Sequence, residues 1–176
     1  LIFTRAALAM VENLDHNVGR MLAAIDSADT SRETIVVFFS DNGPNSLRWC
    51  GGMRGKKGST DDGGTRSVCC IRYPGEIAPG TRVPQMTGAI DLLPTLAGLA
   101  GVPCEFPKPL DGLNVTAILK QDSHLKAEQK VLRTKLFKRY IVASQRGRVS
   151  IRTDRFRLDD KGKLYDMRSD IGQIHD

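Results

Sequence analysis

The sequence has few aromatic residues, few histidines and no long apolar segment. Phe, Trp and Tyr make up 6% of the 176 residues, and three residues are His. No apolar run approaches the ~20 residues that a transmembrane helix needs, so no membrane span is predicted. The four cysteines form no Cys-x-x-Cys pair, and their spacing fits no zinc motif. The cysteines therefore leave the redox compartment open.

The hydrophobic fraction of 40% and the charged fraction of 26% are typical of a globular chain. A chain of this length can bury a core without disulfide bonds. The N-terminus, "LIFTR", has no initiator Met, no charged signal-peptide region and no cleavage site. We therefore expect the chain to begin inside a longer protein, and the sequence does not fix a compartment.

The net charge of +6 is unevenly distributed along the chain. Residues 121–176 hold 14 Lys and Arg against 8 Asp and Glu, whereas residues 1–120 hold 12 of each. A basic segment of this kind is compatible with binding to nucleic acid or another polyanion. The sparse aromatic residues and the lack of a nucleic-acid motif favour a solvated antiparallel sheet with Lys and Arg on its outer face. No nucleic-acid partner is therefore predicted.

Residues 1–120 are predicted to form an α/β domain. Apolar positions at helical spacing predict a helix over residues 4–27. The β-branched and aromatic run "TIVVFFS", residues 34–40, predicts a strand buried on both faces, as in a parallel sheet. Two short helices are expected, one at residues 90–101 and one that follows residues 111–113 and runs through residue 119. The fold class is therefore α/β, with part of a mixed, mostly parallel sheet flanked by helices.

Residues 121–176 are predicted to form a small C-terminal antiparallel subdomain. A polar linker is expected at residues 121–130, and a turn at residues 159–163. The strand candidates are residues 131–137, 139–144, 149–153, 155–158 and 164–167.

Asp41 and Asn42 follow the predicted strand at its carboxyl end, where open α/β sheets bind their ligands. Carboxylate and amide oxygens suit hard cations such as Ca²⁺, which takes six to eight oxygen ligands, so two residues supply only part of a shell. Taken alone, Asp-Asn-Gly is also a common turn. The glycine-rich loop 43–66 carries Lys57, which is either a compact charge for an anionic ligand or a solvated charge.

Five blocks of the sequence, taken in order, resemble the sulfatase family of the alkaline-phosphatase-like superfamily. The blocks are "AMVENLDHNVGRML", "VVFFSDNGP", "MRGKKGSTDDGGTR", "YPGEIAPGTRVPQMTGAIDLLPTLAGLAGV" and "SIRTDRFRLDDKGKLYDMRSDIGQ". Together they span nearly the whole chain. Because several independent blocks occur in family order, the resemblance is far more specific than any single motif.

The resemblance implies roles for individual residues. Asp41 and Asn42 match family positions that ligate a divalent metal, usually Ca²⁺, and Lys57 matches the lysine that contacts the sulfate. Arg54 and Arg66 match loop arginines, for which only a supporting role is expected. The implied activity is that of an arylsulfatase-like sulfuric ester hydrolase acting on an aryl or carbohydrate sulfate. Many relatives work in the periplasm, in lysosomes or after secretion.

The sequence also departs from the family pattern. The family nucleophile is a formylglycine made within a Cys/Ser-x-Pro-x-Arg motif, and "CGGMR" (residues 50–54) has the spacing but lacks the proline. The upstream Asp-Asp metal ligands and the His-containing substrate motif are missing as well. The resemblance therefore implies a C-terminal portion whose formylglycine segment would precede Leu1, and we expect the isolated chain to be inactive.

Two alternatives remain open at this point. One is a phosphodiesterase or phosphonate hydrolase of the same superfamily, which has a similar metal-binding end. The other is a non-catalytic polyanion-binding module that uses the basic C-terminal segment, which would bind with a steep salt dependence. Neither the substrate nor the oligomeric state is predicted.

Overall fold

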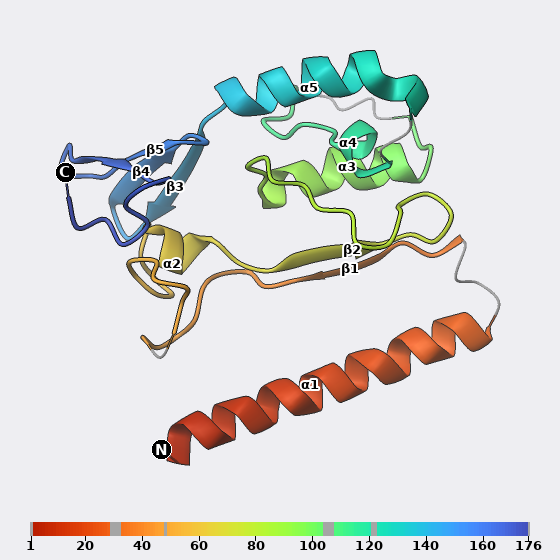
Figure 1. Cartoon of the computed structure of the whole chain (residues 1–176), viewed down its shortest axis with the longest axis horizontal. Helices are drawn as coiled ribbons and strands as arrows, with labels where there is room; N and C mark the ends of the chain where they lie inside the picture. The colour runs from red at the N-terminus through yellow and green to blue at the C-terminus, as the bar shows by residue number, and fades with distance from the viewer. Residues whose placement is uncertain (1, 29–32, 48, 104–107, 121–122, 176) are drawn as a thin grey trace.

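The computed structural model describes residues 2–28, 33–47, 49–103, 108–120 and 123–175. Figure 1 shows α1 along one side of a two-stranded ribbon, the helices α3 to α5 on its other side, and a small sheet at one end. The elements in chain order are α1 (Ile2–Ser27), β1 (Val36–Phe39), α2 (Asp62–Thr65), β2 (Cys69–Arg72), the 3₁₀ turn η2 (Ala89–Asp91), α3 (Leu92–Leu99), α4 (Thr116–Lys120), η3 (Ser123–Leu125), α5 (Lys126–Lys138), β3 (Ile141–Gln145), β4 (Arg148–Arg152), β5 (Phe156–Leu158) and β6 (Leu164–Asp166).

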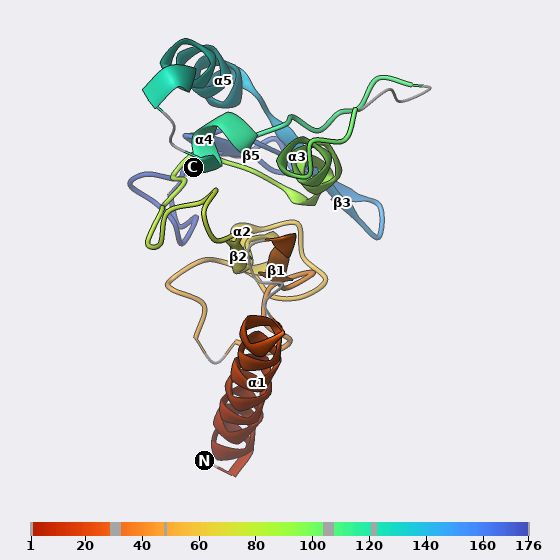
Figure 2. The same cartoon turned by 90° about the vertical axis from the view of Figure 1, so that its right-hand side faces the viewer.

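Helix α1 confirms the predicted first helix and rests against the ribbon along one face only. Val18 and Leu22 of α1 line an apolar cavity of about 390 Å³ together with Val36 of β1. Near its C-terminal end, Asp26 forms an ion pair of 2.7 Å with Arg72 of β2. Figure 2 shows the helix lying beneath β1 and β2, away from α3 to α5. No residue of α1 is fully buried, because one ribbon covers only one side of it.

The predicted mostly parallel sheet is not what the described residues form. Strand β1 pairs antiparallel with β2, with Val36 opposite Arg72 and Phe39 opposite Cys69. The chain leaves β1, makes the long glycine-rich loop and returns alongside the same strand, which is the path of a hairpin. Every strand pair among the described residues is antiparallel. Phe39 is 50% exposed, so β1 is not buried on both faces either.

The core lies between α3, α4 and α5. Leu99, Val115, Ile118, Leu119 and Leu136 form a cluster of buried side chains, and Ile71 of β2 packs against it from the ribbon. The short helix predicted at residues 90–101 is confirmed as η2 with α3, and the one predicted after residues 111–113 is confirmed as α4. These helices therefore fix the position of the ribbon, and with it the end of β1.

A buried carboxylate connects the start of α3 to the end of α5. Asp91 is 2% exposed, and its two oxygens accept hydrogen bonds from the backbone N–H groups of Gly88 and Leu113, each at 2.8 Å. The Nη1 atom of Arg139 lies 2.8 Å from the same carboxylate. With three donors, the charge of Asp91 is fully compensated in the interior. Breaking such a pair by removing one partner is strongly destabilising.

The C-terminal part corrects two predictions, a strand and a linker. Residues 131–137, expected as a strand, lie inside the helix α5. The apolar residues Leu132 and Leu136 are four positions apart, and most of the neighbouring residues are good helix formers, so one helical face meets the core. The predicted linker also enters this helix from residue 126 onward, while residues 121 and 122 lie outside the described part. The domain boundary expected at residue 120 stays a prediction.

The other C-terminal strands form a four-stranded antiparallel sheet in the order β3-β4-β5-β6. A two-residue turn at Arg146 and Gly147, both with positive φ, joins β3 to β4. The predicted turn at residues 159–163 joins β5 to β6. Among the described helices, none combines the length and the apolar character needed to cross a bilayer.

Candidate functional site

The turn after β1 presents the two predicted metal ligands. Asp41 is exposed and Asn42 is partly buried. The hydroxyl of Ser40 donates to the carbonyl oxygen of Asn42 at 3.0 Å. The Asn42 Nδ2 atom donates to the carbonyl oxygen of Gly43 at 3.0 Å. Because the amide nitrogen is engaged in this way, the Oδ1 atom of Asn42 is left to bind a cation or a donor.

The glycine-rich loop folds back onto this turn and brings Lys57 beside it. The backbone N–H of Lys57 donates to the carbonyl oxygen of Pro44 at 2.9 Å, and that of Gly43 donates to Gly64 at 2.9 Å. A Cβ atom at Gly43 would lie 1.9 Å from the carbonyl oxygen of Gly63, so only glycine allows the two backbones to approach this closely. The glycine of the Asn-Gly motif is therefore needed for the close packing of the loop as well as for the turn.

The polar groups of Asp41 and Lys57 are uncommitted within the described part of the chain. No hydrogen bond or ion pair there engages the carboxylate of Asp41 or the ammonium of Lys57. Both side chains are exposed. The described residues also contain no group of three or more His, Cys, Asp or Glu arranged to hold a metal. Asp41 and Asn42 have the hard oxygens that Ca²⁺ prefers, but too few of them for a complete shell.

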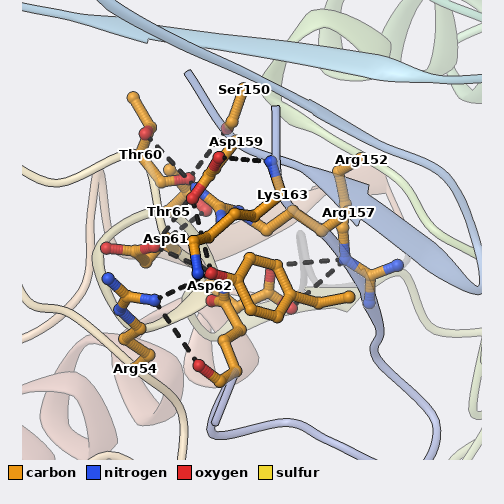
Figure 3. A network of polar contacts seen from close by, with 12 residues as sticks. Arg54, Thr60, Asp61, Asp62, Thr65, Ser150, Arg152, Arg157, Asp159 and Lys163 are labelled. Carbon is orange, nitrogen blue, oxygen red and sulfur yellow. Dashed lines mark hydrogen bonds and ion pairs between the residues drawn. The ribbon is translucent and has the colours of Figure 1, made fainter. Parts of the chain in front are cut away.

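A row of side chains on the C-terminal sheet holds the other end of the loop. Arg152 of β4, Arg157 of β5 and Tyr165 of β6 are register neighbours across the three strands. The Nε atom of Arg152 lies 3.2 Å from a carboxylate oxygen of Asp62, and the Nη2 atom of Arg157 lies 3.2 Å from one of Asp61. Figure 3 shows Asp61 and Asp62 of the loop and the two arginines of the sheet converging. The row therefore fixes the loop that carries Lys57.

Arg54 adds a third contact to the row. Its Nη1 atom donates to the hydroxyl of Tyr165 at 3.3 Å and to the carbonyl oxygen of Gln173 at 3.5 Å. The hydrogen bond with Tyr165 raises the pKa of Arg54 above its ordinary value. The Tyr165 hydroxyl in turn lies 3.5 Å from Asp159. These contacts confirm the structural role expected for Arg54. Arg66 lines the cavity that Asp41 also lines, and its role stays a prediction.

Most Lys and Arg side chains of the C-terminal sheet are exposed, as expected for a solvated surface, but two of its arginines face inward. Arg157 is 1% exposed, and the side chain of Arg152 is 22% exposed. Ser150, on the same face of the sheet, is buried and donates to the carbonyl oxygen of Thr60 at 3.0 Å. Ser150 and Arg152 are two positions apart in β4 and therefore lie on the same face of the sheet, and this spacing was the signal in the sequence that the two side chains share one environment. Sequence reasoning missed these residues because their partners lie about 90 positions away.

Comparisons with known proteins identify the family. Residues 3–102 match the family model described as Sulfatase, and residues 60–176 match that of N-sulphoglucosamine sulphohydrolase, C-terminal. The chain belongs to the sulfatase family. This sulfatase chain is 41% identical over 112 residues to arylsulfatase A from Homo sapiens, which covers 60% of the chain and 22% of the relative. It is 38% identical over 123 residues to steryl-sulfatase from Mus musculus, covering 64% and 20%.

Other matches agree with this assignment. A sulfatase from Formosa agariphila is 33% identical over 141 residues, covering 70% of this sulfatase chain and 25% of the relative. The crystal structure of Ps i-CgsB superposes with a TM-score of 0.72 at 26% identity, covering 95% of the chain and 37% of that structure. The chain thus spans a fifth to a quarter of the curated relatives that it matches here.

Proposed function

We propose that this sulfatase chain forms the part of a sulfuric ester hydrolase that holds a divalent metal and one side of the sulfate group. The observation that carries the proposal is the backbone hydrogen bond between Lys57 and Pro44, which joins the lysine loop to the turn of Asp41 and Asn42. The family match supports sulfate ester hydrolysis as the reaction class.

Each residue has a distinct task in this proposal. Transfer of a sulfuryl group, like that of a phosphoryl group, spreads negative charge over the peripheral oxygens, so preorganised positive charge lowers the barrier. The Lys57 ammonium, a flexible charge with three donors, contacts these oxygens. Asp41 and the Oδ1 atom of Asn42 would hold Ca²⁺, which would supply further charge stabilisation when bound. The remaining ligands and a formylglycine nucleophile would come from outside these 176 residues.

The finer parts of the proposal follow the same logic. The β1–β2 ribbon would be completed by parallel strands from the rest of the sulfatase fold, which would also cover the exposed Phe39. The substrate class is an aryl or carbohydrate sulfate. Relatives include an arylsulfatase, and a neighbouring structure, Ps i-CgsB, was solved in complex with k-i-k-neocarrahexaose. The protein would work in the periplasm, in a lysosome or after secretion.

The test is hydrolysis of 4-nitrophenyl sulfate by the protein expressed from the start codon of its own reading frame. Replacing Lys57 by Ala should lower kcat/KM by roughly 10²- to 10³-fold, the usual loss when one preorganised charge-stabilising group is removed. The matched control is Lys56→Ala, which removes the neighbouring exposed lysine of the same loop and should leave kcat/KM nearly unchanged. Equal losses in the two variants would contradict the assignment of Lys57.

The second candidate is phosphodiester or phosphonate hydrolysis at the same site. It is kept because the observed features, a turn with two oxygen ligands and a nearby lysine, would serve either tetrahedral anion equally well. Bis(4-nitrophenyl) phosphate, assayed beside 4-nitrophenyl sulfate, separates the two. A higher kcat/KM for the phosphodiester would replace the sulfatase proposal by this one.

A further inference from the structure

We propose that a groove beside α5 binds a sulfated saccharide chain, separately from any hydrolysis. The groove has a volume of about 610 Å³, and none of its lining residues is Asp41, Asn42 or Lys57. We call it the α5 groove. It is lined on one side by Lys126, Lys130, Arg133 and Phe137 of α5, and on the other by Gln85, Asp154 and Arg168, among others.

The cations of the α5 groove lie on a single face of the helix. Lys126, Lys130 and Arg133 are spaced by four and three positions, which places them one above another on an α-helix. All three are exposed, and none has an ion-pair partner among the described residues. Three uncompensated positive charges along one wall favour an anionic ligand of some length rather than a single small ion.

The α5 groove also carries groups that suit sugar hydroxyls and sugar rings. Phe137 continues the cationic face one turn further and is 63% exposed, so its ring can pack against the apolar face of a pyranose. On the opposite wall, the carboxylate of Asp154, paired with Arg168 at 2.5 Å, is an acceptor for sugar hydroxyls. Ligand sites commonly combine an aromatic surface with a few polar groups in this way.

This combination favours a sulfated saccharide over a nucleic acid. A saccharide with sulfate groups offers both anions for the lysines and hydroxyl donors for the carboxylate of Asp154. A single-stranded nucleic acid offers a regular row of phosphates, and its binding relies on several aromatic residues that stack successive bases. The α5 groove has one aromatic residue and places a carboxylate opposite the cations.

The experiment measures binding of a fluorescently labelled heparin hexasaccharide to the 176-residue chain by anisotropy. The variant Lys130→Gln/Arg133→Gln removes two charges from the groove face. Its matched control, Lys135→Gln/Lys138→Gln, removes two charges from the same helix but from residues that do not line the α5 groove. We expect the first variant to weaken binding roughly five- to thirty-fold, which corresponds to the loss of two exposed charge contacts. The control should weaken binding less than twofold.

Two further probes complete the test. The same hexasaccharide without its sulfate groups should bind at least tenfold more weakly, and a single-stranded DNA hexamer should bind more weakly than the sulfated sugar at equal salt. Equal losses in the groove variant and the control would show attraction by net charge alone and would overturn the proposal. Tighter binding of the DNA, or equal binding of the desulfated sugar, would overturn it as well. Circular dichroism checks that both variants retain the helix content of the unmodified chain.

Discussion

Arg157 has one ion-pair partner among the described residues, which makes Asp61→Asn an informative perturbation. The Nη2 atom of Arg157 lies 3.2 Å from the Asp61 carboxylate and 3.4 Å from the hydroxyl of Thr60. Its Nε and Nη1 atoms have no hydrogen-bond partner in the described part of the chain. Asparagine keeps the shape of the side chain and an acceptor for Gln173, so the substitution removes little besides the charge.

The expected loss of stability is large for this substitution. Leaving a buried charge without its partner costs about 3–5 kcal/mol, and Arg157 is 1% exposed. The Asp61 side chain is 21% exposed, so water compensates part of the loss and the lower end, about 3 kcal/mol, is the better estimate. With a urea dependence of roughly 2 kcal/mol per molar, the unfolding midpoint should fall by about 1.5 M. Circular dichroism during urea unfolding measures this shift.

Two comparisons show whether the buried charge is the cause. The variant Asp26→Asn breaks the exposed pair between Asp26 and Arg72 and should cost less than about 1 kcal/mol. The double variant Asp61→Asn/Arg157→Met removes both charges and should recover much of the lost stability. If Asp61→Asn shifts the midpoint no more than Asp26→Asn, then the pair does not hold the loop on the sheet and the reasoning fails.

Two other predictions concern the loop and its acid sensitivity. Gly43→Ala should destabilise the chain by roughly 2 kcal/mol or more, because the added Cβ would meet the backbone of Gly63. Gly19→Ala, where α1 leaves open space around the residue, should stabilise the chain by about 1 kcal/mol. Urea unfolding midpoints measure both changes. Burial by itself would raise the pKa of Asp159, but backbone N–H donors from Lys163 and Lys161 outweigh it and hold this pKa below its ordinary value of 3.8. Ionised Asp159 therefore stabilises the fold above about pH 4, and this stabilisation is lost as the pH falls through the lowered pKa, so the urea midpoint of Asp159→Asn should fall less between about pH 5 and pH 2. An equally steep fall in Asp159→Asn would contradict this.

Local patterns in the sequence predicted the elements that depend on local interactions. Helix α1 follows from its apolar spacing, and β3 to β6 follow from short alternating runs with turn residues between them. Part of α5 was predicted as a strand because Val131 and Phe137 favour strands. The helix forms instead because it buries Leu136 in the core. Propensity is a weak guide where tertiary contacts determine the outcome.

Long-range pairing explains what the sequence did not predict. The antiparallel partner of β1 follows it after a loop of more than 25 residues. The composition of the run "TIVVFFS" does not indicate whether the neighbouring strand is parallel or antiparallel. The partners of Asp61 and Asp62 lie more than 85 positions further along the chain. Charge counts alone could not show which arginines of the C-terminal segment were buried. By contrast, Asp41, Asn42 and Lys57 were predicted from local motifs and a family resemblance, and their roles stay predictions.

The most direct test of the proposed site is the response of backbone amide NMR signals to Ca²⁺ and then to sulfate. Because Asp41 and Asn42 provide only part of a coordination shell, we expect Ca²⁺ binding in about the millimolar range. The account predicts that Ca²⁺ shifts the signals of residues 41–43, that added sulfate then shifts those of residues 56–58, and that Asp41→Ala abolishes both responses. Shifts confined to other parts of the chain, or unchanged responses in Asp41→Ala, would contradict it.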